Sequence, residues 1–257
     1  MSPLISLIIT TYNREQYLGK AIESVLQQTY RNVELLVWDD GSSDRSIELA
    51  QKYAQRDRRV RVIAVEHQGA SAAFKGAVAQ TTGTYLGCLD SDDFLAPTTL
   101  EQTARVLDAD PTIGMVYTDY LDLDQQGDVV QYGQRCSIPY ARDRLLVDFM
   151  TFHFRLLRRS VYEQVGGVDT TFPYAHDYDL CLKISEVTTI YHLQQPLYYY
   201  RNHAQSISQA QRIKQTENSW RAVTNALERR GLSDRYAIAV EPPQGRFILH
   251  RKPRSRK

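Results

Sequence analysis

Cysteine is scarce in this sequence, neither sign of charge is in excess, and long hydrophobic runs are missing. The three cysteines, Cys88, Cys136 and Cys181, lie far apart and lack Cys-x-x-Cys or Cys/His spacing. An odd, scattered set argues against a disulfide framework or a zinc site and favours a reducing cytoplasm. The 31 Lys and Arg residues nearly balance the 30 Asp and Glu residues, so the overall charge does not favour nucleic acid as a partner.

Targeting and common nucleotide-binding signatures are missing as well. The N-terminus has no basic region, and its apolar run over residues 4–9 is too short for a signal peptide or a membrane span. We therefore expect a cytoplasmic protein. No GxGxxG follows the first predicted strand, and no GxxxxGK followed by Ser or Thr occurs anywhere. These two absences argue against a dehydrogenase and against a P-loop enzyme.

What is present is an alternation of short aliphatic runs with amphipathic segments. With 257 residues and 42% hydrophobic content, the chain can bury one large core or two small ones. The alternation predicts an α/β fold with a mostly parallel central sheet flanked by helices. The predicted strands are residues 4–10, 33–39, 60–65, 85–89 and 114–118. The predicted helices cover residues 17–26, begin at Ser42-Ser43-Asp44, follow Gly69, and cover residues 98–109.

The alternation stops after residue 120. Residues 122–128 predict a hairpin turn, residues 190–193 and 196–201 two short strands, and residues 209–230 a polar helix. We thus expect a small antiparallel addition and a C-terminal helix. The tail over residues 246–257 has six basic residues and no acid. Such a tail is either disordered or held weakly, by electrostatic attraction, at the anionic inner face of a membrane.

Three acids follow the fourth predicted strand, at the edge where parallel α/β sheets bind ligands. They are Asp90, Asp92 and Asp93. Two such charges about 6 Å apart repel by roughly 3 kcal/mol at an effective dielectric near 20, so we expect a cation beside them. The alternative is a helix-capping turn with solvated acids. A calcium loop is excluded because Phe94 and Leu95 stand where it requires an oxygen ligand and a glycine.

Two other acids occupy comparable positions. Asp40 follows the second predicted strand and precedes a glycine turn, where an Asx turn is the alternative interpretation. Asp177 lies at the start of a predicted helix, at the positive end of the helix dipole. A cap for that helix is the structural interpretation of Asp177, and capping does not exclude a catalytic role.

Taken together, these segments resemble the glycosyltransferases of family 2, enzymes with the GT-A fold that transfer a sugar from a nucleotide diphosphate to an acceptor. The resemblance extends from Leu4 to about Ser208. The segments that carry it, in the order that the family shows, are SLIITTYNREQYLGKAIESVLQQTY, VWDDGSSD, YLGCLDSDDFLAP, VGGVD, AHDYDLCLKI and PLYYYRNHAQSIS.

The resemblance implies a Rossmann-like GT-A sheet and inverting, metal-dependent sugar transfer in polysaccharide biosynthesis. Its implied cofactor is Mn or Mg, its donor a nucleotide-diphospho-sugar such as a UDP-sugar, and its acceptor a glycan or a lipid-linked hydroxyl. It also implies a division of the chain. Residues 1–208 would form the GT-A domain, with a nucleotide-binding part over residues 1–119 and an acceptor part over residues 120–208. Residues 209–257 would form a C-terminal helix and a basic tail.

By the same resemblance, residues of two distant segments form the metal and diphosphate site. Asp92 would touch the metal directly, and Asp90 would contact the ribose or a metal-bound water. Asp93 is interpreted as the cap of the following turn. His203 either completes the metal shell or is solvated, and Arg201 either faces the diphosphate or is solvated.

The resemblance also assigns the base and the nucleotide contacts. Direct displacement needs a proton acceptor opposite the leaving diphosphate, and Asp177 matches the acid that takes this role. His176 stands where the family usually has Glu, which leaves the acceptor contact open. The implied nucleotide contacts are Thr10, Tyr12 and Asp40, with Lys75 either at the phosphates or on the surface.

Two other functions stay open. The chain could be a nucleotide- or glycan-binding module with little turnover, or a metal-dependent hydrolase of nucleotide sugars. Asp177 favours an enzyme over a binding module, and His176 favours the opposite. A hydrolase would be identified by water acting as the acceptor.

Overall fold

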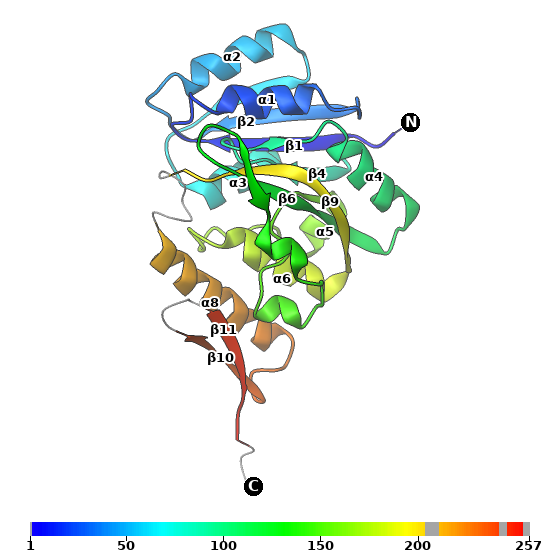
Figure 1. The fold of residues 1–257 in the computed structure, drawn as a ribbon, viewed down its shortest axis with the longest axis vertical. Helices are drawn as coiled ribbons and strands as arrows, with labels where there is room; N and C mark the ends of the chain where they lie inside the picture. Colours follow the sequence, from blue (N-terminus) through cyan, green and yellow to red (C-terminus); the bar gives the residue numbers. More distant parts are fainter. Residues whose placement is uncertain (1, 204–210, 242–245, 254–257) are drawn as a thin grey trace.

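A nine-stranded sheet organises the protein, which is seen in a computed structural model that describes residues 2–203, 211–241 and 246–253 (Figure 1). Along the sheet the order is β3-β2-β1-β4-β8-β6-β9-β5, and β7 pairs with β6. The strands are β1 (Ile5–Thr11), β2 (Val33–Asp39), β3 (Val60–Ala64), β4 (Tyr85–Cys88), β5 (Phe94–Leu95), β6 (Ile113–Leu123), β7 (Val129–Tyr132), β8 (Arg155–Arg158) and β9 (Thr189–Arg201).

Helices cover both faces of this sheet because its central strands are apolar on both sides. One face packs against α1 (Leu18–Leu26), α2 (Ser46–Arg56) and α4 (Thr99–Ala109). The other face packs against α3 (Ala70–Ala79), α5 (Arg159–Gln164), α6 (His176–Val187) and α8 (Arg212–Arg229). The predicted α/β fold with a mostly parallel sheet is confirmed, since β1, β2, β3 and β4 are parallel to one another.

The second half of the sheet departs from the predicted strands. β8 runs antiparallel between β4 and β6, so these two predicted strands are not neighbours. The two short strands predicted over residues 190–201 are one long strand, β9, whose pairing with β6 contains register shifts near Asp119. The prediction of two strands was wrong: Pro196 lies opposite Asp119 at the irregularity, so the strand continues through it. The hairpin predicted over residues 122–128 joins β6 to β7 and is confirmed.

The start of α2 also differs from its prediction. This helix begins at Ser46 rather than at Ser42-Ser43-Asp44. Asp44 accepts the backbone N–H of Ser46 at 2.9 Å and that of Glu15 at 3.0 Å. It therefore ties the turn before α2 to the loop after β1, and these hydrogen bonds lower its pKa although partial burial acts to raise it.

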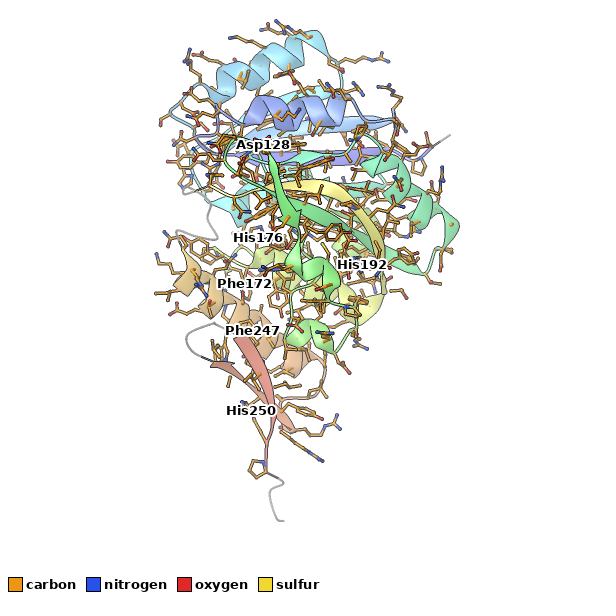
Figure 2. The ribbon with its side chains drawn as sticks, in the orientation of Figure 1. Asp128, Phe172, His176, His192, Phe247 and His250 are labelled. Carbon is orange, nitrogen blue, oxygen red and sulfur yellow. The ribbon has the colours of Figure 1, made fainter. Side chains whose placement is uncertain are left out.

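The C-terminal part forms its own small sheet. β10 (Tyr236–Glu241) pairs antiparallel with β11 (Arg246–Arg251), near the end of the molecule that carries Phe247 and His250 (Figure 2). The expectation of a disordered tail is thus wrong for residues 246–251. Membrane attachment through this tail stays a prediction, and residues 254–257 lie outside the described part. No helix in the described part of the chain is long and apolar enough to cross a bilayer.

The predicted C-terminal helix is present as α8. Its apolar side contributes Ala222, Val223, Ala226 and Leu227 to the core that α6 shares. Arg229 adds an ion pair to Glu186 of α6, with a nitrogen to oxygen distance of 2.8 Å. The predicted division at residue 208 falls within residues 204–210, which lie outside the described part, and it stays a prediction.

Candidate active site

The loops after β1 and β2 are joined side by side. Both strands are parallel, so their carboxyl ends meet at one edge of the sheet. Asn13, which has a positive φ of 53°, accepts the backbone N–H of Ser43 through its side-chain oxygen at 2.8 Å. The Asn13 backbone N–H donates to the hydroxyl of Ser42 at 2.9 Å. These bonds hold the predicted nucleotide-binding loops in one arrangement.

Asp93, the third acid of the DSDD turn, has a structural role. Its buried carboxyl group accepts the hydroxyl of Tyr198 at 2.6 Å and the backbone N–H of Arg201 at 2.7 Å. Burial, together with the charges of Asp92 and Asp90, raises its pKa well above the usual range. The interpretation of Asp93 as a turn cap is wrong: the residue anchors β9 beside the turn, and so brings Arg201 and His203 to it.

Asp92 lies between a histidine and an arginine. The Nε2 atom of His203 is 2.8 Å from its Oδ2 atom, and the Nε atom of Arg14 is 3.3 Å from the same oxygen. Burial acts to raise the pKa of Asp92, but the hydrogen bond from His203 and the charge of Arg14 outweigh it and lower this pKa. The structure thus brings together Asp92 and His203, the two predicted metal ligands.

Arg201 is buried beside the same turn. Its Nε donates to the carbonyl of Asp92 at 3.1 Å and its Nη1 to the carbonyl of Gln125 at 2.9 Å. The guanidinium also lies over the ring of Tyr17, 5.1 Å from the centroid. Backbone carbonyls therefore fix its position, and a partner carboxylate is absent among the described residues.

Asp90 faces a buried histidine that the sequence did not single out. The side chain of Asp90 keeps 48% of its surface accessible, and its Oδ2 lies 3.8 Å from Nε2 of His153. Burial and the charge of Asp92 raise the pKa of Asp90 to about 7. The ring of His153 stacks on that of Tyr198, with centroids 4.4 Å apart.

The oxygen and nitrogen donors around this turn fit a divalent cation. Asp90, Asp93 and His153 each offer one ligand atom, and these atoms lie within 4.8 Å of one another. Asp92 and His203 offer a second carboxylate and a second imidazole. Carboxylates suit Mn²⁺, and a bound cation would offset both the desolvation and the charge of Asp92 that raise the pKa of Asp90. Because Tyr198 and Arg201 already occupy Asp93, the remaining candidate ligands are Asp90 and His153, with Asp92 and His203, which contact each other in this structure.

Asp177 contacts an arginine of β8 whose charge also acts on the acid turn. Nη1 of Arg155 lies 3.2 Å from Oδ2 of Asp177, and the Oδ1 atom accepts the backbone N–H of Tyr178 at 2.9 Å. Burial acts to raise the pKa of Asp177, but the charge of Arg155, together with the neighbouring His176 and His153, lowers it. The charge of Asp177 in turn contributes to the raised pKa of Asp90. The acid turn and the predicted base therefore lie within electrostatic range of each other, with Arg155 acting on both.

His176 precedes this carboxylate at the N-terminus of α6 (Figure 2). The residue before it, Ala175, has a positive φ of 60°, a strained conformation for a residue with a side chain. The Nδ1 atom of His176 is buried without a hydrogen-bond partner among the described residues. Burial lowers the pKa of His176, so the ring is neutral near pH 7.

Tyr12 and Asp40 meet at another histidine. The Tyr12 ring, 43% exposed, stacks on His67 with centroids 4.3 Å apart, and Nδ1 of His67 lies 2.9 Å from Oδ2 of Asp40. Asp40 also accepts the backbone N–H groups of Gln68 and Gly69, each at 2.9 Å. Gly69 has a φ of 90°, which glycine adopts without strain. Asp40 thus holds the segment that leads into α3.

The two remaining predicted nucleotide contacts, Thr10 and Lys75, lie on β1 and α3. Thr10 is half-buried in β1, opposite Trp38 of β2. Lys75 is exposed on α3 and makes no ion pair or hydrogen bond with a described residue. Their roles stay predictions.

His153 and Arg155 are the main residues that the sequence reasoning missed. Both lie in FHFRLL, where a histidine and an arginine two positions apart interrupt an apolar run. Period-two spacing places both on one face of an extended segment, so polar side chains there are a usable signal of a site.

The sequence is similar to those of known proteins. The sequence model of the family described as Glycosyl transferase family 2 matches residues 6–166. The chondroitin synthase of Escherichia coli is 32% identical over 230 residues, which cover 90% of this chain and 33% of that protein. The hyaluronan synthase of Pasteurella multocida is 30% identical over 231 residues, covering 90% of this chain and 24% of that protein. The chain thus spans between a quarter and a third of these relatives.

The fold is also that of a solved structure. The mannosyltransferase of Pyrobaculum calidifontis, solved in complex with GDP-Man and Mn²⁺, superimposes with a TM-score of 0.72. The match covers 89% of this chain and 65% of that one, at 19% sequence identity. At this identity the likeness concerns the fold: a curled, mostly parallel sheet with helices on both faces.

Proposed function

This chain belongs to glycosyltransferase family 2 and has the GT-A fold, and from this premise we propose that it transfers a sugar from a nucleotide-diphospho-sugar to a hydroxyl group. The acceptor would be a glycan or a lipid-linked saccharide, and the anomeric carbon would be inverted. The reaction would depend on Mn or Mg and take place in the cytoplasm. The observation that carries the proposal is that Arg155 contacts Asp177 while the charges of both residues act on Asp90 of the acid turn.

The cation would be held by Asp90 and Asp92, with His203 and His153 as the nitrogen donors in reach. Such an ion supplies electrostatic stabilisation of the negative charge that develops on the departing diphosphate. Arg201 supports the same purpose, because its buried guanidinium has donors to offer and no partner carboxylate among the described residues. A planar fork of this kind suits phosphate oxygens.

Asp177 would accept the proton of the attacking hydroxyl. Its lowered pKa keeps the carboxylate ionised at neutral pH, as a base must be. Arg155 and the backbone N–H of Tyr178 each engage one oxygen of this carboxylate. Two such restraints fix the carboxylate plane, so that the free lone pairs keep one direction toward the acceptor.

The nucleotide base would lie against Tyr12, with Asp40 nearby. The exposed Tyr12 ring offers a flat face to the base. His67 already stacks on this ring, with ring centroids 4.3 Å apart. Thr10 lies near the end of β1, the strand that precedes Tyr12. Lys75 would reach toward the phosphates from α3. Asp177, Arg201 and His203 lie outside the residues that the family model matches, so their assignment rests on the geometry.

Two substitutions test this function. Asp177→Asn should abolish transfer while nucleotide affinity stays within a few fold, because the amide keeps the shape but cannot take a proton. Asp92→Ala should lose metal-dependent nucleotide binding. Nucleotide release from a panel of nucleotide sugars with Mn²⁺ measures the first, and calorimetric titration measures the second. Asp234→Asn, on an exposed loop, is the matched control.

Retained transfer by the Asp177→Asn variant would contradict the base assignment. Nucleotide release that is equally fast with and without a saccharide acceptor would identify a hydrolase instead.

A further inference from the structure

We propose that Arg135 forms an anion-binding subsite for the acceptor, which recognises a carboxylate or phosphate group close to the hydroxyl that Asp177 deprotonates. The inference rests on the proposed sugar transfer and adds to it the chemical class of the acceptor. Arg135 belongs to a short 3-10 helix, η1 (Gln134–Ser137), which follows β7. The proposed subsite consists of Arg135, Phe149 and Phe152.

Aromatic stacking holds the Arg135 side chain in place. Its guanidinium carbon lies 4.1 Å from the ring centroid of Phe152 and 5.6 Å from that of Phe149. The Nη1 atom donates to the carbonyl of Phe149 at 3.3 Å. One of its five N–H groups is thus used, and stacking leaves the edge of the guanidinium plane available to a ligand.

Phe149 and Phe152 also contact residues next to the proposed base. Arg155, which contacts Asp177, also lies over the Phe149 ring, with its guanidinium carbon 5.8 Å from the ring centroid. Phe149 also packs against Tyr178, the residue after Asp177, with centroids 4.6 Å apart. Phe152 contacts the ring of His153 at 4.1 Å. Phe149 therefore contacts Arg135 on the one hand, and Arg155 and Tyr178 beside the proposed base on the other.

The charges of the site distinguish Arg135 from its neighbours. Arg14 and Arg155 each have a carboxylate partner, Asp92 and Asp177. Arg135 is half-buried and has no carboxylate within 4 Å among the residues that the structure describes. A partly desolvated cation without a counterion is costly, and a bound anion would remove that cost. An arginine fork accepts a carboxylate or a phosphate through two parallel hydrogen bonds.

The location assigns this anion to the acceptor rather than to the donor diphosphate. In the proposed function the donor's phosphates lie beside Asp90 and Asp92 of the turn after β4 and beside Arg201 of β9. Arg135 lies on the Phe149 and Tyr178 side, where Asp177 would meet the incoming hydroxyl. Because the aromatic rings between the two are half-buried rather than buried, they leave surface for the apolar face of a sugar.

Matched saccharides test the subsite by equilibrium binding. The probes are methyl β-glucoside, methyl β-glucuronide and glucose 6-phosphate, titrated into the full chain at low salt with UDP and Mn²⁺ present. One charge-assisted bidentate contact predicts that an anionic probe binds about tenfold more tightly than the neutral glucoside. The glucuronide and phosphate arms show which anion the subsite prefers. Arg135→Gln should remove the preference, and Arg135→Lys should retain part of it.

Arg221→Gln is the matched control. Arg221 stacks on Phe172 at 3.8 Å and donates to the carbonyl of Thr171, but it lies on α8 away from the proposed subsite. This variant should keep the preference for the anionic probes. Thermal unfolding of each variant shows whether folding is intact.

Equal affinity for the anionic and neutral probes in the unmodified chain, or no detectable binding of either anionic probe, overturns the proposal. So does an Arg135→Gln variant that folds and keeps the preference. The proposed function fails separately: a chain that prefers the anionic probes but releases no nucleotide from any nucleotide sugar has the subsite without the transfer.

Discussion

Replacing Arg155 with glutamine should move the acid limb of the pH-rate profile to higher pH. Arg155 is 16% exposed in its side chain and Asp177 is 32% exposed, and their contact distance is 3.2 Å. The folded-state pKa of Asp177 is below its usual value. The carboxylate is therefore ionised at all pH values above that point, and the loss of activity on acidification lies at low pH. Glutamine keeps a hydrogen-bond donor but removes the charge.

The size of the shift follows from the contact. Opposite charges about 4 Å apart attract by about 4 kcal/mol at an effective dielectric near 20, which corresponds to about 3 pKa units. The partial exposure of Asp177 screens this attraction, and a nearby opposite charge shifts a carboxyl pKa by about 1 to 3 units. We expect the acid limb to rise by about 1 to 2 pH units, so that, between about pH 7 and pH 4, the variant loses activity on acidification at a higher pH than the unmodified chain does.

The assay is kcat at saturating donor, acceptor and divalent cation across this range. Saturating cation is needed because Asp90, whose pKa is about 7 without one, would otherwise add a limb of its own. Arg155→Lys should leave the limb nearly in place, since it keeps the charge. Arg158→Gln is the control on the same strand: its guanidinium bonds the carbonyl of Ile113 at 2.9 Å, so it should lower stability without moving the limb.

An unchanged acid limb in a folded Arg155→Gln variant would refute the reasoning. A shift of equal size in Arg155→Lys would refute it too, because the cause would then be geometry rather than charge.

Two further predictions concern the acid turn. Asp90 must be ionised to bind a cation, and its pKa is about 7, so the affinity for Mn²⁺ should rise with pH through about 7. Calorimetric titration should find this affinity about tenfold weaker at pH 6 than at pH 8. Equal affinity at both pH values would contradict the prediction. Tyr198→Phe removes the hydroxyl that donates to buried Asp93 at 2.6 Å, so it should lower the free energy of unfolding by about 1–3 kcal/mol in urea titrations. The control Tyr191→Phe, at an exposed position, should leave the free energy of unfolding unchanged. A loss no larger than that of the Tyr191 variant would show that Asp93 does not need this donor.

Local sequence patterns determined the first half of the fold. β2 was predicted with its observed bounds, β1, β3, β4, α1 and α4 within one or two residues, and α3 at its start. These elements follow from side-chain periodicity and from local signals such as Gly69 before α3, which act within a few residues along the chain. The same locality predicted that Asp90 and Asp92 would share a turn, and that Asp177 would stand at a helix start.

The tertiary structure alone decided how the second half is assembled. β8 enters antiparallel between β4 and β6, and this position carries His153 and Arg155 to the acid turn and to Asp177. Strand order depends on contacts between residues far apart in sequence, which no local period encodes. In the same way, pairing with β10 makes a strand of residues 246–251, where composition alone predicted disorder. The sequence by itself therefore determined which acids are available, whereas long-range packing decided which cations face them.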